Sequence, residues 1–242
     1  MTRTKIAGLE VVLTGGTDLP QRDGGGTGPL VVLMHGFGAP GDDLVALARV
    51  MRVPRAVRFA FPAAPHETHM MPGMDSRAWW NIDMIELQTA MMRGDMHALT
   101  TREPDGLDEA RARIDALLTE LREKLEPSAL VLGGFSQGSM LAIDVALRTA
   151  QNVDALAILS GTLLARDVWI PKLDKLRGKR VFQSHGRQDP ILPFAIAEEL
   201  HRELVKAGAE TSFVPFRGAH EIPPQVLDAL CTFLEPVLTK TA

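Results

Sequence analysis

The sequence is poor in the residues that build disulfides, metal clusters and phenolic active sites. It contains one cysteine, Cys231, and no tyrosine among its 242 residues. A single cysteine excludes an intrachain disulfide and a cysteine-based metal cluster. Without tyrosine, no mechanism can use a phenol as acid or nucleophile. These absences narrow the chemistry that the chain can perform.

The sequence also lacks a basic surplus and long apolar runs. Its 26 basic and 30 acidic residues give a net charge of −4, which argues against a nucleic-acid partner, because phosphates need an excess of cations. No apolar run approaches the roughly 18 residues of a membrane span. The apolar stretch after Arg3 and Lys5 ends at Glu10, short of the about 7–15 apolar residues of a secretory signal. We therefore expect a cytoplasmic protein with no membrane span.

What is present indicates one globular domain over residues 1–242. Apolar residues make up 45% of the chain and charged residues 23%, as in folded proteins generally. Strands alternate with helices after residue 30, which predicts an α/β fold with a mainly parallel, doubly wound sheet and helices on both faces. The expected strands cover residues 9–14, 30–34, 57–61, 129–132, 155–159, 180–184 and 211–216. The expected helices cover residues 42–51, 107–125, 137–150 and 194–206, with a last helix from about residue 223.

The clearest periodic element is the helix over residues 107–125. Its apolar residues recur at steps of three and four, Asp105 is the expected N-cap, and Pro127 follows the end. The preceding residues 62–106 are irregular and rich in proline, methionine and tryptophan. Because the loop after a parallel strand emerges at the sheet edge where ligands bind, we expect residues 62–106 to form a lid or a pocket wall.

The strongest functional signal is Gly134-Phe135-Ser136-Gln137-Gly138, which matches the G-x-S-x-G nucleophile elbow. An apolar strand leads into it and a helical pattern leads out. Such a strand–turn–helix places the serine on a sharp turn, and small neighbours relieve the crowding. A chance glycine-rich turn would not need the strand and helix around it. The sequence therefore predicts Ser136 as a nucleophile.

A serine hydroxyl needs a base to take its proton, and in this type of fold an acid and then a histidine follow the serine. Of the later histidines, His201 lies mid-helix among charged residues and His185 ends a strand. His220 lies between the last strand and the last helix, which suits the base. Asp189 follows the penultimate strand and could orient His220, although an ordinary turn aspartate before proline is the alternative. The rival acids, none of which follows that strand directly, are Asp144, Asp154, Asp167 and Asp174.

Backbone donors for an oxyanion are expected in two places. The segment His35-Gly36-Phe37-Gly38 follows the buried strand 30–34, and a glycine-rich turn there can aim an N–H group at developing negative charge. The natural pair of donors is the backbone N–H of Phe37 with that of Gln137, the residue after the nucleophile. We expect His35 to brace the loop rather than to react.

Five short blocks of the sequence occur together in one known family. They are Met34–Gly38, Arg77–Trp80, Gly133–Gly138, Gln183–Pro190 and Gly218–His220. With them, the chain resembles the phospholipase/carboxylesterase family of α/β-hydrolases, which includes bacterial carboxylesterases and acyl-protein thioesterases. The resemblance implies the α/β-hydrolase fold and a triad of Ser136, Asp189 and His220. Asn81 stands where the family often has aspartate, and residues 84–106 depart from the family pattern, so the resemblance implies the reaction but not the substrate.

Two weaker signals lie in the irregular segment. His66-Glu67-Thr68-His69 places its histidines three residues apart instead of the four of H-E-x-x-H, so no metal site is expected. The second signal is a methionine cluster, which could line an acyl pocket, because thioethers adapt to varied apolar shapes; a loosely packed core is the alternative. We expect Trp79, Trp80, Met91 and Met92 to form the pocket wall. The clustered methionines are Met70, Met71, Met74, Met84, Met91, Met92 and Met96.

Together these patterns predict a serine carboxylesterase that hydrolyses short- to medium-chain esters through an acyl-enzyme, with water completing the reaction and no cofactor. An acyl thioesterase or lysophospholipase with the same triad is the first alternative. A non-catalytic binding protein with the same fold is the alternative of another class. The expected partner is a small acyl ester, and a homodimer is left open.

Overall fold

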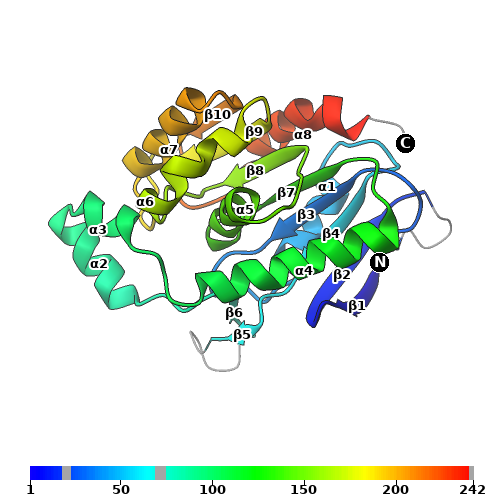
Figure 1. The fold of residues 1–242 in the computed structure, drawn as a ribbon, viewed down its shortest axis with the longest axis horizontal. Helices are drawn as coiled ribbons and strands as arrows, with labels where there is room; N and C mark the ends of the chain where they lie inside the picture. The colour runs from blue at the N-terminus through cyan, green and yellow to red at the C-terminus, as the bar shows by residue number, and fades with distance from the viewer. Residues whose placement is uncertain (18–22, 69–74, 240–242) are drawn as a thin grey trace.

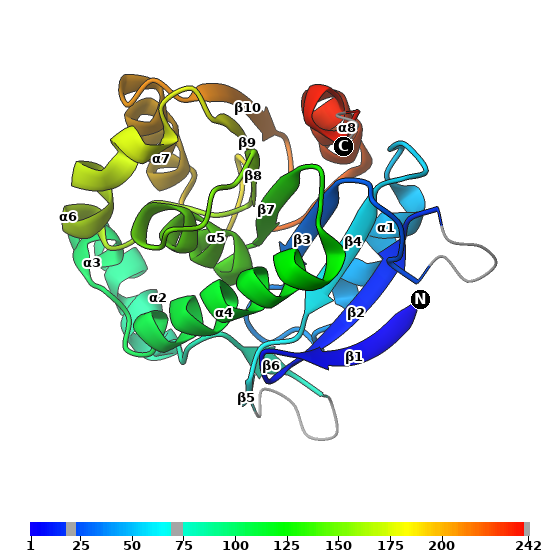
Figure 2. The ribbon, with the colours of Figure 1, turned by 45° about the vertical axis from the view of Figure 1, so that its right-hand side comes forward.

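The computed structural model describes residues 1–17, 23–68 and 75–239. The strands of its central sheet are β1 (Thr2–Ile6), β2 (Leu9–Gly15), β3 (Leu30–Met34), β4 (Arg58–Pro62), β7 (Leu130–Phe135), β8 (Ala155–Leu159), β9 (Arg180–Gly186) and β10 (Glu210–Phe216). Within the described residues the sheet has eight strands in the order β1-β2-β4-β3-β7-β8-β9-β10 (Figures 1 and 2). The pairs β1–β2 and β2–β4 are antiparallel, and all pairs from β4 to β10 are parallel.

Helices cover both faces of the sheet. The main helices are α1 (Leu47–Val50), α4 (Leu107–Leu125), α5 (Gln137–Arg148), α7 (Phe194–Lys206) and α8 (Pro224–Leu238). On β3, Leu30, Val32 and Met34 share a buried cluster with residues of α4, α5 and α7. Val31 and Leu33 point the other way, into a cluster with residues of α8. Because successive strand residues alternate between the faces, a strand covered on both sides is apolar throughout. The predicted mainly parallel, doubly wound sheet is confirmed.

Helix α4 has the predicted bounds but not the predicted N-cap. Its buried residues follow the expected spacing and include Leu107, Ile114 and Leu121. The N-cap is Gly106, at φ +90°, and no side chain caps the helix. The Asp105 side chain is fully exposed, so the expected Asp105 cap was wrong. The chain enters α4 with a positive φ, which favours glycine. The N-cap is therefore the glycine at position 106 and not the aspartate before it.

Outside residues 62–106, three of the described elements were not predicted. β1 adds an antiparallel edge strand, and its short polar sequence gave no apolar run to recognise. Between β8 and β9 the chain forms α6 (Arg166–Trp169) followed by a 3₁₀ helix over Ile170–Leu176. Each of these helices has too few turns to show a periodic apolar pattern.

Residues 62–106 are more regular than expected. The segment contains a small antiparallel pair, β5 (His66–Glu67) and β6 (Arg77–Ala78), and the helices α2 (Met84–Arg93) and α3 (Met96–Thr101). The two helices lie together at one end of the molecule, away from β1 (Figure 1). The Asp83 side chain caps α2 by accepting the N–H groups of Ile85 and Glu86.

The excursion through α2 and α3 begins and ends at one place. A Cβ atom placed on Gly106 would lie 3.3 Å from the Cβ of Trp80. The chain therefore leaves the body of the protein after Trp80 and returns beside it. Arg148 of α5 pairs with Glu103, which ties the returning chain to the main core.

Candidate active site

Ser136 lies on the sharp turn between β7 and α5. Its backbone has φ +52° and ψ −120°, a conformation that costs a non-glycine residue about 1–3 kcal/mol. Its carbonyl oxygen accepts the backbone N–H groups of Ser139 and Met140 and the Ser139 hydroxyl. The residue keeps a small exposed fraction of 9%. This strained turn, held by the first turn of α5, is the geometry predicted for the elbow.

The turn is close enough to β3 that a larger residue would not fit at Gly138. A Cβ atom there would lie 2.2 Å from the Met34 carbonyl oxygen and 2.6 Å from that of His35. Real Cβ atoms do not approach backbone this closely. Gly138 therefore allows α5 to begin directly against the end of β3, which brings the loop after β3 next to Ser136.

The loop after β3 carries the Phe37 N–H, one of the two backbone groups expected to donate to an oxyanion. A Cβ on Gly36 would lie 3.2 Å from the Ser136 Cβ, so the loop touches the elbow. The N–H of Gly38 donates to the Arg77 carbonyl. In the described part of the chain, the N–H groups of Phe37 and Gln137 have no hydrogen-bond partner, and the first N–H groups of a helix lack one within the helix. Both groups are thus free to bind a ligand oxygen, which is the role proposed for them below.

His35 braces this loop, as expected. Its Nδ1 donates to the Gly36 carbonyl at 2.7 Å, and its Nε2 accepts the Ala64 N–H at 2.9 Å. The indole N–H of Trp79 donates to the His35 carbonyl at 3.0 Å. Burial is the largest influence and lowers the pKa of His35, which suits a ring that uses one nitrogen as donor and the other as acceptor.

The Gln137 side chain performs a task that the sequence did not reveal. Its Oε1 accepts the Trp79 backbone N–H at 2.9 Å, and its Nε2 donates to the Trp80 carbonyl at 2.8 Å. The residue that follows the nucleophile therefore clamps the chain at the root of the α2–α3 excursion. These two hydrogen bonds join residues more than fifty positions apart, so no local pattern in the sequence could have indicated them.

The side chains expected to wall an acyl pocket occupy different environments. Trp79 and Trp80 are buried in the main core, Met91 is half-buried, and Met92 is 82% exposed. Met70, Met71 and Met74 lie outside the described residues. The same holds for His69, whereas His66 belongs to β5. The pocket wall stays a prediction, with the tryptophans at its base and Met92 at the surface.

Asp189 and His220 come together directly. The Nδ1 of His220 lies 2.7 Å from Asp189 Oδ2, and the His220 ring lies 4.7 Å, between ring centroids, from that of Phe135, the neighbour of Ser136. Asp189 Oδ1 accepts the backbone N–H groups of Ile191 and Leu192, each at 2.9 Å. The elbow, the acid and the histidine thus meet at the carboxyl edge of the sheet.

Asp189 is well suited to remain ionised. Burial pushes the pKa of its carboxyl upward, but hydrogen bonds from His185, His220 and the Leu192 N–H outweigh burial and hold that pKa far below its usual range. The two loops approach closely, since a Cβ on Gly186 would lie 2.0 Å from the Ala219 carbonyl oxygen. Glycine at this position lets the Asp189 loop reach the His220 loop.

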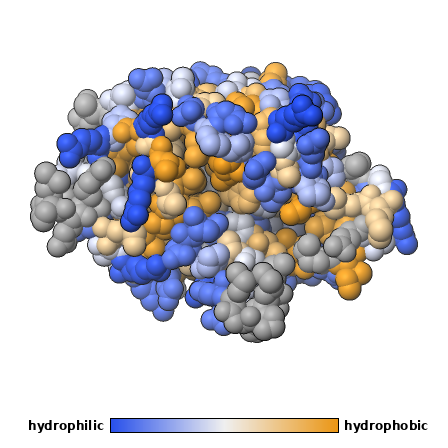
Figure 3. Space-filling model, turned by 180° about the vertical axis from the view of Figure 1, so that it is seen from behind, coloured by the Kyte–Doolittle hydropathy of each residue, from blue (hydrophilic) through white to orange (hydrophobic). Residues whose placement is uncertain are grey.

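The surface near α2 and α3 is partly apolar. Seen from behind, apolar side chains extend across the middle of the face and toward the side on which α2 and α3 lie (Figure 3). Ile85 is 78% exposed and lies two turns from Met92 on α2. No helix in residues 1–17, 23–68 and 75–239 is long and apolar enough to cross a membrane.

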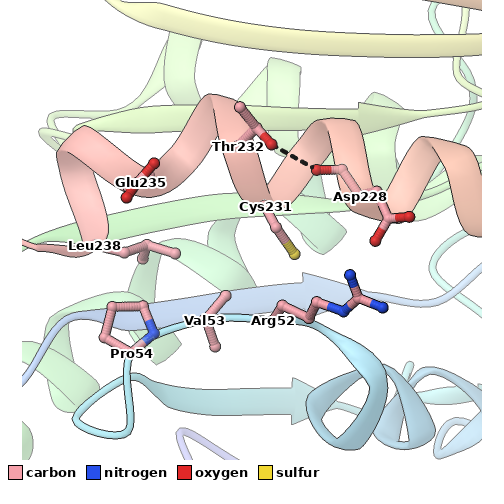
Figure 4. A pocket seen from close by; sticks show the side chains of 8 residues that line it. All are labelled: Arg52, Val53, Pro54, Asp228, Cys231, Thr232, Glu235 and Leu238. Atoms are coloured by element: carbon pink, nitrogen blue, oxygen red, sulfur yellow. Dashed lines mark hydrogen bonds between the residues drawn. The ribbon is translucent and has the colours of Figure 1, made fainter.

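A cavity of about 570 Å³ lies elsewhere, between residues 52–54 and α8. The Cys231 thiol points toward it (Figure 4), and burial raises the pKa of that thiol. None of the residues around the cavity belongs to the elbow, the acid or the histidine loop. The other lining residues are Arg52, Val53, Pro54, Asp228, Thr232, Glu235 and Leu238.

Comparison with known proteins agrees with this architecture. The chain is 26% identical over 219 residues to acyl-protein thioesterase 1 of Kluyveromyces lactis, covering 86% of this chain and 92% of the relative. The Saccharomyces cerevisiae acyl-protein thioesterase 1 is 25% identical over 222 residues, with coverages of 86% and 92%.

Solved structures show the same fold. Esterase PE8 superposes with a TM-score of 0.77 at 25% identity, covering 97% of this chain and all of that chain. The Zea mays acyl-protein thioesterase 2 gives a TM-score of 0.72 at 19% identity, with coverages of 94% and 98%. The phospholipase/carboxylesterase family model matches residues 25–238. The chain therefore has the α/β-hydrolase fold and belongs to the phospholipase/carboxylesterase family.

Proposed function

We propose that this protein is a serine hydrolase of carboxylic esters that works through an acyl-enzyme. The observation that carries the proposal is the 2.7 Å contact between His220 Nδ1 and Asp189 Oδ2, formed beside a strained Ser136 at the start of a helix. In this arrangement Asp189 holds the imidazole so that its Nε2 faces away from the carboxylate. That nitrogen is then available as the base for Ser136.

The reaction proceeds in two halves. His220 takes the hydroxyl proton of Ser136 while Oγ attacks the acyl carbonyl, and it returns the proton to the departing alkoxide. Water then attacks the acyl-enzyme with His220 again as base, which releases the acid and restores Ser136. The N–H groups of Phe37 and Gln137 donate to the oxyanion in both halves. Losing one such donor typically costs about 10²–10³ in kcat.

A thioester is the second candidate substrate. The relatives named above are acyl-protein thioesterases at 25–26% identity, and the same steps cleave a thioester with a thiolate as leaving group. Short- to medium-chain acyl groups remain the expectation for either leaving group. A cytoplasmic setting and a homodimer stay predictions.

A rate panel tests the proposal. Chromogenic esters and matched thioesters of increasing acyl length would be hydrolysed by the wild type, and Ser136→Ala should lower kcat by about 10⁴–10⁶-fold while keeping the fold. An organophosphate should label Ser136 alone. A wild type that binds esters without turnover would instead support the non-catalytic binding protein. Near-wild-type turnover by Ser136→Ala would refute the assignment of the nucleophile.

A further inference from the structure

Asp189 lies within reach of two histidines. Besides His220, the Nε2 of His185 lies 3.2 Å from Asp189 Oδ2. The same nitrogen lies 2.9 Å from the Leu192 carbonyl oxygen. His185 is the last residue but one of β9. Its side chain is fully buried and packs against the Phe194 ring at 6.1 Å between centroids. The proposed proton transfers do not use His185, so its burial beside the acid calls for another role.

The surroundings of His185 determine which ring nitrogen carries hydrogen. Two acceptors, Leu192 O and Asp189 Oδ2, face Nε2, so Nε2 must be a donor. Nδ1 is buried and has no hydrogen-bond partner among the described residues. A hydrogen on Nδ1 would be a buried donor without an acceptor, which is unfavourable. The contacts therefore select the tautomer with hydrogen on Nε2, which is hydrogen-bonded to the Leu192 carbonyl and lies 3.2 Å from the Asp189 carboxylate.

We infer that His185 is a positioning residue that fixes the Asp189 carboxylate and shares its negative charge. The inference rests on the proposed function. Oδ1 is held by the N–H groups of Ile191 and Leu192, but Oδ2 would otherwise be held by His220 alone. His220 gains and loses a proton in each half of the proposed reaction. His185 does not react, so it gives Oδ2 a donor that stays in place throughout the cycle.

Sharing the charge has a consequence for pH dependence. A carboxylate whose negative charge is partly offset by a second nearby N–H group stabilises a protonated His220 less strongly. Removing the His185 donor should therefore let His220 hold its proton to higher pH. The other charged groups beside this cluster are Arg187, whose guanidinium lies 4.7 Å from the Phe194 ring centroid, and Glu221, whose Oε1 accepts the Ala219 N–H. Substituting His185 leaves both in place.

Among the described residues near His185 are aromatic and amide side chains that form no hydrogen bond with its ring. On the same face of β9, Gln183 donates to the Ala197 carbonyl of α7 at 2.8 Å. The Phe194 ring stacks on Phe213, which in turn contacts the ring of His201. His201 is thus separated from His185 by two aromatic rings. The surroundings hold the His185 ring in place and leave Asp189 as the one carboxylate within reach of its Nε2 in the described part of the chain.

Two variants of His185 test the inference. His185→Leu keeps an apolar side chain of similar bulk without a donor, whereas His185→Gln places an amide N–H near the position of Nε2. His185→Leu should lower kcat/KM by about tenfold and move its acid limb to higher pH by roughly half a unit. His185→Gln should keep the acid limb at the wild-type pH. An unchanged limb in both variants, with reduced stability alone, would overturn the inference.

A measurement without turnover separates this inference from the proposed function. The midpoint of His220 titration, followed by NMR in Ser136→Ala and in Ser136→Ala/His185→Leu, should rise in the double variant. That result would support the role of His185 even if no ester were hydrolysed, and an unchanged midpoint would refute it in an active enzyme. If His185→Leu does not fold, His185→Asn replaces it, because its shorter amide does not reach Asp189, and the same two outcomes decide.

Discussion

Helix α5, which begins at the proposed nucleophile, and helix α2, in the segment expected to cover it, are packed in opposite ways. Every residue of α5 from Gln137 to Leu147 is buried. None of the described side chains of α2 is buried, and Ile85 and Met92 are largely exposed. The proposed nucleophile thus lies at the start of a helix fixed by the core, while helix α2, in the segment proposed to contact the acyl chain, has no buried side chain among those described. Rigid support suits chemistry, and a loosely packed surface suits varied apolar ligands.

The largest expected effect comes from making the same substitution, glycine to alanine, in both helices and comparing the loss of stability. Gly138→Ala should abolish folding or cost more than about 4 kcal/mol, because its Cβ would lie 2.2 Å from a backbone oxygen. Gly94→Ala, at the end of α2, meets no atom within 4 Å and bears only the strain of φ +65°, about 1–2 kcal/mol. Urea unfolding of both variants measures the difference. Equal destabilisation would mean that the elbow is not as closely packed as described.

A second test concerns the acid. Asp189→Asn should lower kcat by about 10³–10⁴-fold, since an amide N–H in place of Oδ2 would face the donor nitrogens of His220 and His185. The fold should persist, because the retained carbonyl oxygen can still accept the N–H groups of Ile191 and Leu192. Circular dichroism and steady-state kinetics check both statements. Asp144→Asn is not a suitable control variant, because Asp144 is buried and bonded to Arg111 and Trp169, so its substitution would itself destabilise the fold.

The low pKa of Asp189 also fixes the sign of a pH effect. A depressed carboxyl pKa stabilises the fold above the pKa of the unfolded chain, and that stabilisation disappears as pH falls through the lower folded value. Asp189 therefore remains ionised through the mildly acidic range. Asp189 therefore does not set the acid limb of kcat/KM, and that limb should move to lower pH in Asp189→Asn, because the neutral amide no longer stabilises a positive charge on the catalytic base. A limb that persisted unchanged in this variant would assign it to another group.

A third test shortens one methionine to alanine in each of the helices α5 and α2. Met140 of α5 is 6% exposed and Met92 of α2 is 82% exposed. Met140→Ala should lower the free energy of unfolding by about 2–4 kcal/mol, whereas Met92→Ala should change it by less than about 0.5 kcal/mol. Thermal or urea unfolding gives both values. A large loss in Met92→Ala would show that α2 is covered in solution.

The smallest expected effect concerns substrate choice. Met91→Ala/Met92→Ala should leave the rate on acetate esters nearly unchanged but shift the acyl length at which kcat/KM stops rising. Each methylene buried on the wall is worth about 0.8 kcal/mol, so the change should be several-fold at medium length and absent at the shortest. A length profile that overlays the wild type would place the acyl wall elsewhere.

The same contrast explains what could be predicted from the sequence. Ser136, Asp189 and His220 follow strands in a fixed order, so local patterns and topology together indicated all three. The clamp between Gln137 and the Trp79–Trp80 backbone joins residues that are far apart in the chain, and nothing local marks it. Helix α2 has recognisable ends, an N-cap at Asp83 and a glycine after its last residue at Gly94. It was not predicted, because apolar residues also lie on its exposed side and the sequence therefore shows no clear amphipathic pattern. The Asp105 cap failed because backbone direction outweighed side-chain preference.

The close approach of Trp80 and Gly106 places the two ends of residues 81–105 side by side. Because both ends meet at one point on the body, a shorter or longer replacement could join them without moving the central sheet, and the entropy of closing a loop changes only slowly with its length. Such a replacement would have to restore the packing of Ile82 and Leu99 against the core. Insertions with adjoining ends are tolerated for the same reason. In such an architecture, one surface segment can change while the turn at Ser136 and its supporting sheet stay as they are, and under the proposed function that segment is where differences in acyl preference would arise.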